Sequence, residues 1–162
     1  MDKLDKFMSC FGDPIDGVHV VPQKRIIDGR GGIMHMKKCT DDDFKGFGEI
    51  YFSFANPGVI KAWHVHSRMY VNNCVVSGLA KLVCYDLRTD SPTRGNLMEI
   101  YLGRDNYCTV QIPPGIANGY MPIGNEPAML ANCASIAHEP GEMSYIDPYS
   151  EDIPYDWAIK NG

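Results

Sequence analysis

The chain is built of short runs in which apolar, β-branched and aromatic residues alternate with polar ones, bounded by glycine, proline or asparagine. These runs predict strands at 17–23, 33–37, 49–55, 61–66, 70–76, 79–87, 96–102, 109–112 and 128–134. No window keeps a helical period for more than a turn or two. Short strands at intervals of roughly ten residues are typical of an antiparallel sandwich or barrel. We therefore expect an all-β barrel, which can hold one small ligand if side chains do not fill it.

Turn residues separate these strands. The segment 28–32 contains three glycines and predicts a turn, and Asn56-Pro57-Gly58 predicts another. Ser77-Gly78, between the runs 70–76 and 79–87, predicts a hairpin in which these two strands pair with each other.

Length and composition favour one domain. A chain of 162 residues with 44% hydrophobic content can bury one good core, so we take 1–162 as a single domain, with an N-terminal extension at 1–16 and a C-terminal tail at 149–162. The formal charge of -5 argues against a nucleic acid or an anionic membrane as partner. A phosphate ligand would therefore need a few well-placed Lys or Arg side chains.

The cysteines indicate a reducing compartment. Six are present, at positions 10, 39, 74, 84, 108 and 133, and none forms a Cys-x-x-Cys pair. Cys74 and Cys84 lie in apolar runs, where a thiol behaves as a small buried hydrophobe. No stretch of about 18 apolar residues occurs, so neither a signal peptide nor a membrane span is expected. We predict a cytoplasmic protein.

The candidate chemistry lies in Lys61-Ala62-Trp63-His64-Val65-His66. Alternate residues of a strand point to the same face, so His64 and His66 should project together, with Lys61 close by. Histidine gains and loses a proton near neutral pH, and two on one face indicate a site for proton transfer rather than two structural side chains.

Several blocks of the sequence, in this order, resemble the cupin superfamily, and within it the dTDP-4-dehydrorhamnose 3,5-epimerase family. The blocks are Asp28-Gly29-Arg30-Gly31, Lys61-x-x-His64, Val75-Val76-x-Gly78, Asp86-Leu87-Arg88-x-x-Ser91-Pro92-Thr93, and Ile112-Pro113-x-Gly115-x-Ala117-x-Gly119-Tyr120. Together they cover about residues 17–148. The resemblance implies a double-stranded β-helix, or jelly-roll barrel, and an isomerase that epimerises a nucleotide-linked 4-keto-6-deoxy sugar in deoxysugar or polysaccharide biosynthesis.

The resemblance also implies roles for individual residues. His64 would be the base, Lys61 would stabilise the enolate oxygen, and His66 would tune His64 or bind the sugar. We expect Arg30, Arg88, Ser53, Asn118 and Tyr120 to bind the substrate, although Arg88 is equally well explained as a structural partner of Asp86. No cofactor is implied. Members of the family exchange N-terminal strands in a homodimer, so we expect the segment 17–37 to pair with a partner subunit and Arg30 to approach the partner's site.

The chain also departs from the family. Lys61 stands where members have Arg, and Asn118 stands where they have a second His. The tyrosine that serves as the acid would fall near Ala137 or His138, where none occurs, and the aspartate that pairs with the catalytic histidine would lie beyond Gly162. Possible replacements for the acid are Tyr120, Tyr70 and Tyr145.

Three other functions are open from the sequence. Metal-dependent cupins also begin from a His-x-His strand, but no carboxylate follows His66 closely and Asn118 replaces the second-motif histidine, so we expect a metal-independent protein. A 3,4-ketoisomerase could use the same His-x-His strand. A cupin that binds a sugar without converting it is the non-enzymatic alternative.

Overall fold

The computed structural model describes residues 10–160, which form strands and loops without a helix. The strands are β1 (Cys10–Gly12), β2 (His19–Pro22), β3 (Arg25–Asp28), β4 (Gly31–Met34), β5 (Glu49–Ala55), β6 (Lys61–His66), β7 (Val71–Ser77), β8 (Leu79–Asp86), β9 (Leu97–Gly103), β10 (Cys108–Ile112), β11 (Ile116–Pro122), β12 (Ala128–Ala134) and β13 (Met143–Tyr145). The expected all-β class is confirmed. Among the described residues, no helix is long and apolar enough to cross a membrane.

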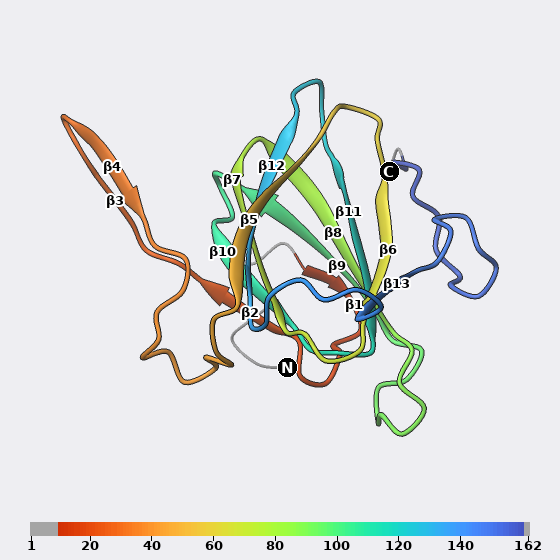
Figure 1. Cartoon of the computed structure of the whole chain (residues 1–162). Helices are drawn as coiled ribbons and strands as arrows, with labels where there is room; N and C mark the ends of the chain where they lie inside the picture. The colour runs from red at the N-terminus through yellow and green to blue at the C-terminus, as the bar shows by residue number, and fades with distance from the viewer. Residues whose placement is uncertain (1–9, 161–162) are drawn as a thin grey trace.

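Two antiparallel sheets face each other and form the barrel (Figure 1). One sheet has six strands in the order β1-β9-β8-β11-β6-β13, and the other has five in the order β2-β10-β7-β12-β5. The space between them is filled at one end by aliphatic side chains, including Ile100, Leu102, Val110 and Ile112, each at most 1% exposed. This is the predicted jelly roll, and the unfilled end holds the cavity described below.

The predicted hairpin at Ser77-Gly78 is wrong, although both strands exist. β7 pairs with β10 and β12, whereas β8 pairs with β9 and β11, so the turn carries the chain from one sheet to the other. Gly78 has φ +76°, and a Cβ there would lie 2.4 Å from the carbonyl oxygen of Pro127. The glycine is needed for this turn, but the turn residues do not determine which sheet each strand joins.

The expected strands omitted β11, although it lies in the middle of the six-stranded sheet between β8 and β6. Its sequence, IANGYMP, contains glycine and proline and follows a Pro-Pro-Gly turn, so composition alone does not favour a strand. Gly119 is explained by crowding, because a Cβ at this position would lie 2.2 Å from the Cβ of Ala62 on β6. The short strands β1, β3 and β13 were also not expected, since three or four residues give too short a pattern.

The N-terminal strands divide between two environments. β2 pairs with β10 of the same chain on one side, but it is the outermost strand of its sheet and no described strand covers its other edge, so the expectation that 17–37 pairs with a partner stays a prediction. β3 and β4 instead form a separate two-stranded hairpin that projects from the barrel (Figure 1). Within 17–37, the hairpin formed by β3 and β4 is the part that joins neither barrel sheet.

The C-terminal segment packs against the outer face of the six-stranded sheet. Ile153 and Trp157, each 2% exposed, contact Trp63, Val83 and Met121 in a second apolar cluster. Successive side chains along β6 point to opposite faces of the sheet, and Trp63 is on the outer face. The same alternation directs His64 into the barrel.

Candidate active site

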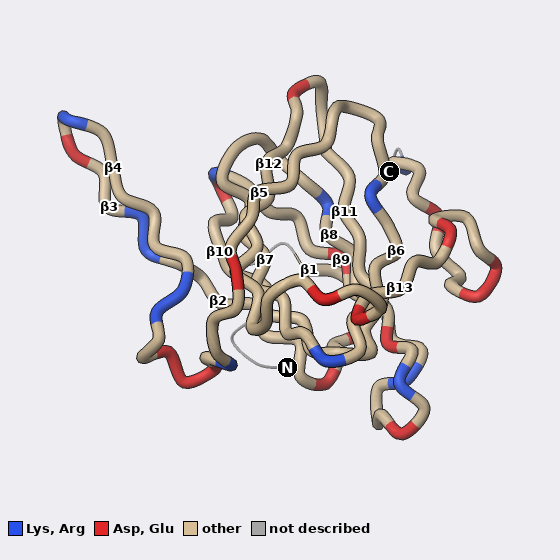
Figure 2. The backbone as a smooth tube through the Cα atoms, viewed as in Figure 1, with Lys and Arg blue, Asp and Glu red and all other residues tan. Residues whose placement is uncertain are grey.

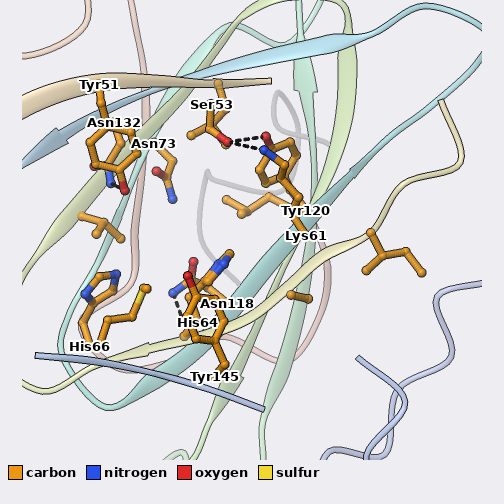
Figure 3. A pocket seen from close by; sticks show the side chains of 16 residues that line it. Tyr51, Ser53, Lys61, His64, His66, Asn73, Asn118, Tyr120, Asn132 and Tyr145 are labelled. Atoms are coloured by element: carbon orange, nitrogen blue, oxygen red, sulfur yellow. Dashed lines mark hydrogen bonds between the residues drawn. The ribbon is translucent and has the colours of Figure 1, made fainter. Parts of the chain in front are cut away.

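A cavity of about 460 Å³ opens between the two sheets and is lined mainly by polar side chains (Figure 3). The six-stranded sheet contributes Lys61, His64, His66, Asn118, Tyr120 and Tyr145, and the five-stranded sheet contributes Tyr51, Ser53, Asn73 and Asn132. Hydroxyl and amide groups on both walls suit a polyhydroxylated ligand, because each can donate or accept a hydrogen bond.

A β-bulge brings Lys61 onto the cavity face of β6. In the pairing of β6 with β11, His64 lies opposite Asn118 but Lys61, not Ala62, lies opposite Tyr120. A regular strand would direct residues three apart to opposite faces, and the extra residue of a bulge cancels this difference. Lys61 and His64 therefore line the same cavity, and the close backbone approach at Gly119 permits the bulge.

His64 is neutral at physiological pH. Burial, the neighbouring His66 and the positive charge of Lys61, in that order of importance, lower the pKa of His64 to about 4. Its ring makes an edge contact with Tyr145, with centroids 5.1 Å apart. A neutral imidazole in this cavity has a lone pair with which to accept a proton.

His66 is held by a carboxylate that the sequence did not reveal. His66 Nδ1 lies 2.7 Å from Glu142 Oε2, and Glu142 Oε1 accepts hydrogen bonds from the backbone N–H groups of Arg68 and Met69 at 2.9 and 2.8 Å. Burial opposes ionisation, but these hydrogen bonds prevail and lower the pKa of Glu142 to about 2. An ionised carboxylate can only accept, so the Nδ1 of His66 carries the proton. This arrangement fixes the ring, which lines the cavity.

Lys61 is part of a polar network that joins the two walls. Its Nζ donates to Ser53 Oγ at 3.1 Å, and Ser53 Oγ is 2.8 Å from the hydroxyl of Tyr120 (Figure 3). Among the described residues that line the cavity, Lys61 is the only Lys or Arg. Its ammonium group is therefore the fixed positive charge toward which an oxygen with developing negative charge would orient.

Asn118 braces the strand on which the histidines lie. Its Nδ2 donates to the backbone carbonyl of His64 at 3.1 Å, so the residue supports β6 as well as lining the cavity. The cavity brings together six of the predicted site residues, namely Lys61, His64, His66, Ser53, Asn118 and Tyr120.

The two predicted arginines are not brought to this cavity. Arg88 donates to both carboxylate oxygens of Asp86 at 2.9 Å and to the backbone carbonyl of Asp16 at 2.7 Å. This is the structural pairing that was open from the sequence. Arg30 lies at the tip of the β3–β4 hairpin, its side chain 92% exposed and paired with Asp28 (Figure 2).

Three polar residues that line the cavity were not predicted, namely Tyr51, Asn73 and Asn132, and neither was Glu142, which contacts His66 but is not among the lining residues. The alternation along β5 could have indicated Tyr51, because it shares a face with Ser53. Asn73 is 4% exposed and follows the buried Asn72 on β7, where buried amides are unusual enough to suggest a site. Glu142 lies in a loop 76 residues from His66, and no local pattern connects the two.

Two of the three tyrosines considered as acids, Tyr120 and Tyr145, line the cavity, whereas Tyr70 is not among its lining residues. Within residues 10–160, no group of three or more His, Cys, Asp and Glu side chains is arranged to hold a metal ion.

Comparison with known proteins identifies the family. The dTDP-4-dehydrorhamnose 3,5-epimerase family matches residues 13–161. The spore coat polysaccharide biosynthesis protein SpsL of Bacillus subtilis is 33% identical over 142 residues, covering 88% of this chain and 91% of that protein. A probable low-salt glycan biosynthesis epimerase of Haloferax volcanii is 34% identical over 131 residues, covering 80% of this chain and 81% of that protein.

Solved structures agree with the sequence relatives. A dTDP sugar isomerase from Desulfovibrio desulfuricans superposes with a TM-score of 0.88 at 38% identity, covering 91% of this chain and 95% of that chain. The resemblance derived from the sequence blocks is confirmed, and so is the expected class of enzyme, a sugar-nucleotide epimerase. The chain therefore belongs to the dTDP-4-dehydrorhamnose 3,5-epimerase family.

Proposed function

We propose that this protein epimerises a nucleotide-linked 4-keto-6-deoxy sugar in deoxysugar or polysaccharide biosynthesis, without a metal or other cofactor. The C–H bonds at C3 and C5 of such a sugar are acidified by the C4 carbonyl, so a base can remove either proton if the enolate is stabilised. The observation that carries the proposal is a neutral His64 beside the cationic Lys61 in one polar cavity.

Each residue has a defined task. His64 accepts the proton from the carbon next to the carbonyl. Lys61 Nζ stabilises the negative charge that develops on the carbonyl oxygen. His66, oriented by Glu142, and the side chains of Ser53, Asn118 and Tyr120 hold the sugar hydroxyls. The spore coat and glycan relatives support a role in polysaccharide biosynthesis.

Solvent exchange tests this function. Incubation in deuterated water with a panel of nucleotide-linked 4-keto-6-deoxy sugars should place deuterium at C3, C5 or both, and should yield an epimer. An unlabelled sugar that nevertheless binds would favour the non-catalytic cupin. Migration of the carbonyl from C4 to C3 would favour the 3,4-ketoisomerase.

Metal independence is supported by the donor set. His64 lies close enough to the cationic Lys61 for that charge to lower its pKa, and a divalent cation would be repelled by the same charge. Elemental analysis of protein purified without an affinity tag should give less than stoichiometric Zn, Fe, Mn and Ni. One tightly bound ion per chain, with activity lost to a chelator, would contradict this part of the proposal.

We further propose a homodimer in which the β3–β4 hairpin covers the partner's β5. The hairpin exposes Ile26, Ile27 and Ile33 at 54, 64 and 62%. β5 is an edge strand whose outward side chains, among them Phe52 at 60% exposed, form an uncovered apolar stripe. Exposed apolar edges are normally paired or protected, and a two-fold contact is the commonest solution. The exchange would carry Arg30 toward the partner's cavity, where its guanidinium could bind a diphosphate.

Light scattering tests the dimer. The full chain should be dimeric at micromolar concentration, and Ile27→Asp should weaken the dimer because it places a charge in the apolar contact. Ile159→Asp, which alters a similarly exposed isoleucine on the C-terminal segment, is the matched control and should remain dimeric. A truncated protein that lacks residues 1–37 and stays dimeric and active would refute the exchange.

The cytoplasm remains the proposed compartment. It is supported by the cysteines Cys74, Cys84, Cys108 and Cys133, which are buried and form no disulfide.

A further inference from the structure

Epimerisation needs a proton donor on the wall of the cavity opposite the base. A proton leaves one face of the sugar ring, and the configuration inverts only if another proton arrives at the other face. His64 lies on the six-stranded sheet, so the donor is expected on the five-stranded sheet.

The tyrosines on the wall of His64 do not meet this requirement. Tyr145 pairs directly with His64 in the register of β13 and β6, and its ring rests against the imidazole. It therefore approaches the sugar from the same side as the base. Tyr120 lies on β11 of the same sheet, and its hydroxyl is engaged by Ser53.

Tyr51 is the tyrosine on the opposite wall. It lies on β5 two residues before Ser53, on the strand face that lines the cavity, while Ile50 and Phe52 point outward. Figure 3 shows Tyr51 and Asn132 across the cavity from His64 and Tyr145. The position fits delivery of a proton to the face that His64 does not reach.

The hydrogen bond to Tyr51 leaves its proton available. Asn132 is 2% exposed, and its Oδ1 accepts the backbone N–H of Asn72 at 3.1 Å. Because a backbone N–H can only donate, the amide orientation is fixed, and Asn132 Nδ2 donates to the Tyr51 hydroxyl at 2.8 Å. The Tyr51 oxygen is thus an acceptor in this bond, and its own O–H can donate into the cavity.

The electrostatics are consistent with an acid that releases a proton only to a strong base. Burial raises the pKa of Tyr51 above its ordinary value, so the hydroxyl stays protonated at neutral pH. The Asn132 hydrogen bond acts in the opposite direction, because it stabilises the tyrosinate that forms after the proton has left. A carbanionic enolate is basic enough to take this proton.

We propose that Tyr51 is the general acid of this protein, in place of the tyrosine that is absent near Ala137. The inference rests on the proposed function. His64 removes the proton from one face of the carbon, and the C–H electrons form an enolate whose oxygen lies at Lys61. The Tyr51 O–H then protonates the opposite face, leaving tyrosinate and imidazolium. Exchange of one proton from the imidazolium to the tyrosinate through solvent restores both groups.

Separate measurement of exchange and epimerisation tests this role. Tyr51→Phe keeps the ring and removes the hydroxyl, so His64 can still form the enolate and return a solvent-derived deuteron to the same face. We expect deuterium incorporation with retained configuration, while epimer formation falls by about 100-fold or more. Tyr70→Phe, outside the cavity, is the matched control and should leave both rates unchanged.

Three results would overturn the assignment. Epimer formation within about threefold of the wild-type rate in Tyr51→Phe would show that the hydroxyl is not the donor. Loss of exchange together with epimerisation in a folded Tyr51→Phe protein would make Tyr51 a binding residue. Retained exchange without epimerisation in Tyr145→Phe, but not in Tyr51→Phe, would assign the acid to Tyr145. Failure of the proposed function is distinguishable, because the wild-type protein itself would then show no exchange.

Discussion

His64 and His66 lie two residues apart on one face of β6, yet their surroundings differ. His64 lies near Lys61 and against the ring of Tyr145, and burial lowers its pKa to about 4. His66 is tied through Nδ1 to the buried, ionised Glu142. A strand can bring two imidazoles to the same cavity, but the groups delivered by other segments decide what each imidazole does. His64 is left as a neutral acceptor, whereas His66 is held in one orientation by the hydrogen bond from its Nδ1 to Glu142.

The largest expected effect comes from His64→Asn. Removal of the base should lower both deuterium exchange and epimerisation by about 100- to 10,000-fold, because general base catalysis contributes that much. His66→Asn, which alters sugar binding and orientation in the proposal, should reduce activity less. Exchange kinetics on both variants check the order, with circular dichroism as the control for folding. If His64→Asn exchanges deuterium at the wild-type rate, another residue is the base.

Glu142→Gln should mainly affect stability. The amide keeps an acceptor for the backbone N–H groups of Arg68 and Met69 but loses the charge that holds His66. Charge-assisted hydrogen bonds of this kind contribute about 1.5–3 kcal/mol each, so the free energy of unfolding at pH 7 should fall by about that amount. Urea denaturation measures the change. An unaltered midpoint would mean that the pair does not stabilise the fold.

His64 and Glu142 should lose their contributions to the stability of the fold in different pH ranges. For His64, the unfolded chain binds a proton near pH 6.5 and the folded protein only near pH 4, so its contribution is full above pH 6.5 and is lost as the pH falls toward 4. For Glu142, the contribution is full above about pH 4.5 and is lost as the pH falls toward 2.

Urea denaturation at a series of pH values separates these contributions. His64→Asn should flatten the stability profile between pH 6.5 and 4, whereas Glu142→Gln should flatten it below pH 4.5. Identical pH profiles for the wild type and both variants would contradict the assigned shifts.

The pH dependence of activity gives a further test of His64. With a free-enzyme pKa of about 4, kcat/KM should stay constant down to about pH 5 and fall only below it, under conditions where the protein remains folded. An acid limb near pH 6.5 would point to a base with an ordinary histidine pKa.

The smallest expected change is in the pKa of His64 when Lys61 is replaced. Its positive charge is the last of the three causes that lower the pKa of His64. Lys61→Met should therefore raise the pKa of His64 slightly, as followed by NMR titration of its ring protons. The same variant should lose activity, because the enolate loses its stabilising charge. If the pKa of His64 is unchanged in this variant, the charge of Lys61 does not influence the base.

The sequence by itself determined the all-β class, most of the barrel strands and the shared face of His64 and His66. These features follow from a period of two and from turn residues, which are local properties of the chain. It also carried the blocks that identify the family. It failed where local composition misleads, at β11 with its glycine and proline, and where a turn connects two sheets rather than two paired strands, at Ser77-Gly78.

Only the tertiary structure decided the partners of the site residues. Glu142 reaches His66 from 76 residues away, Asn132 orients Tyr51 across two adjacent strands, and the bulge opposite Gly119 turns Lys61 into the cavity. It also shows that Arg88 pairs with Asp86 and does not line the cavity. The physical reason is that proton affinity and hydrogen-bond direction depend on what surrounds a side chain in space, and strands distant in the sequence supply those surroundings only when the two sheets close.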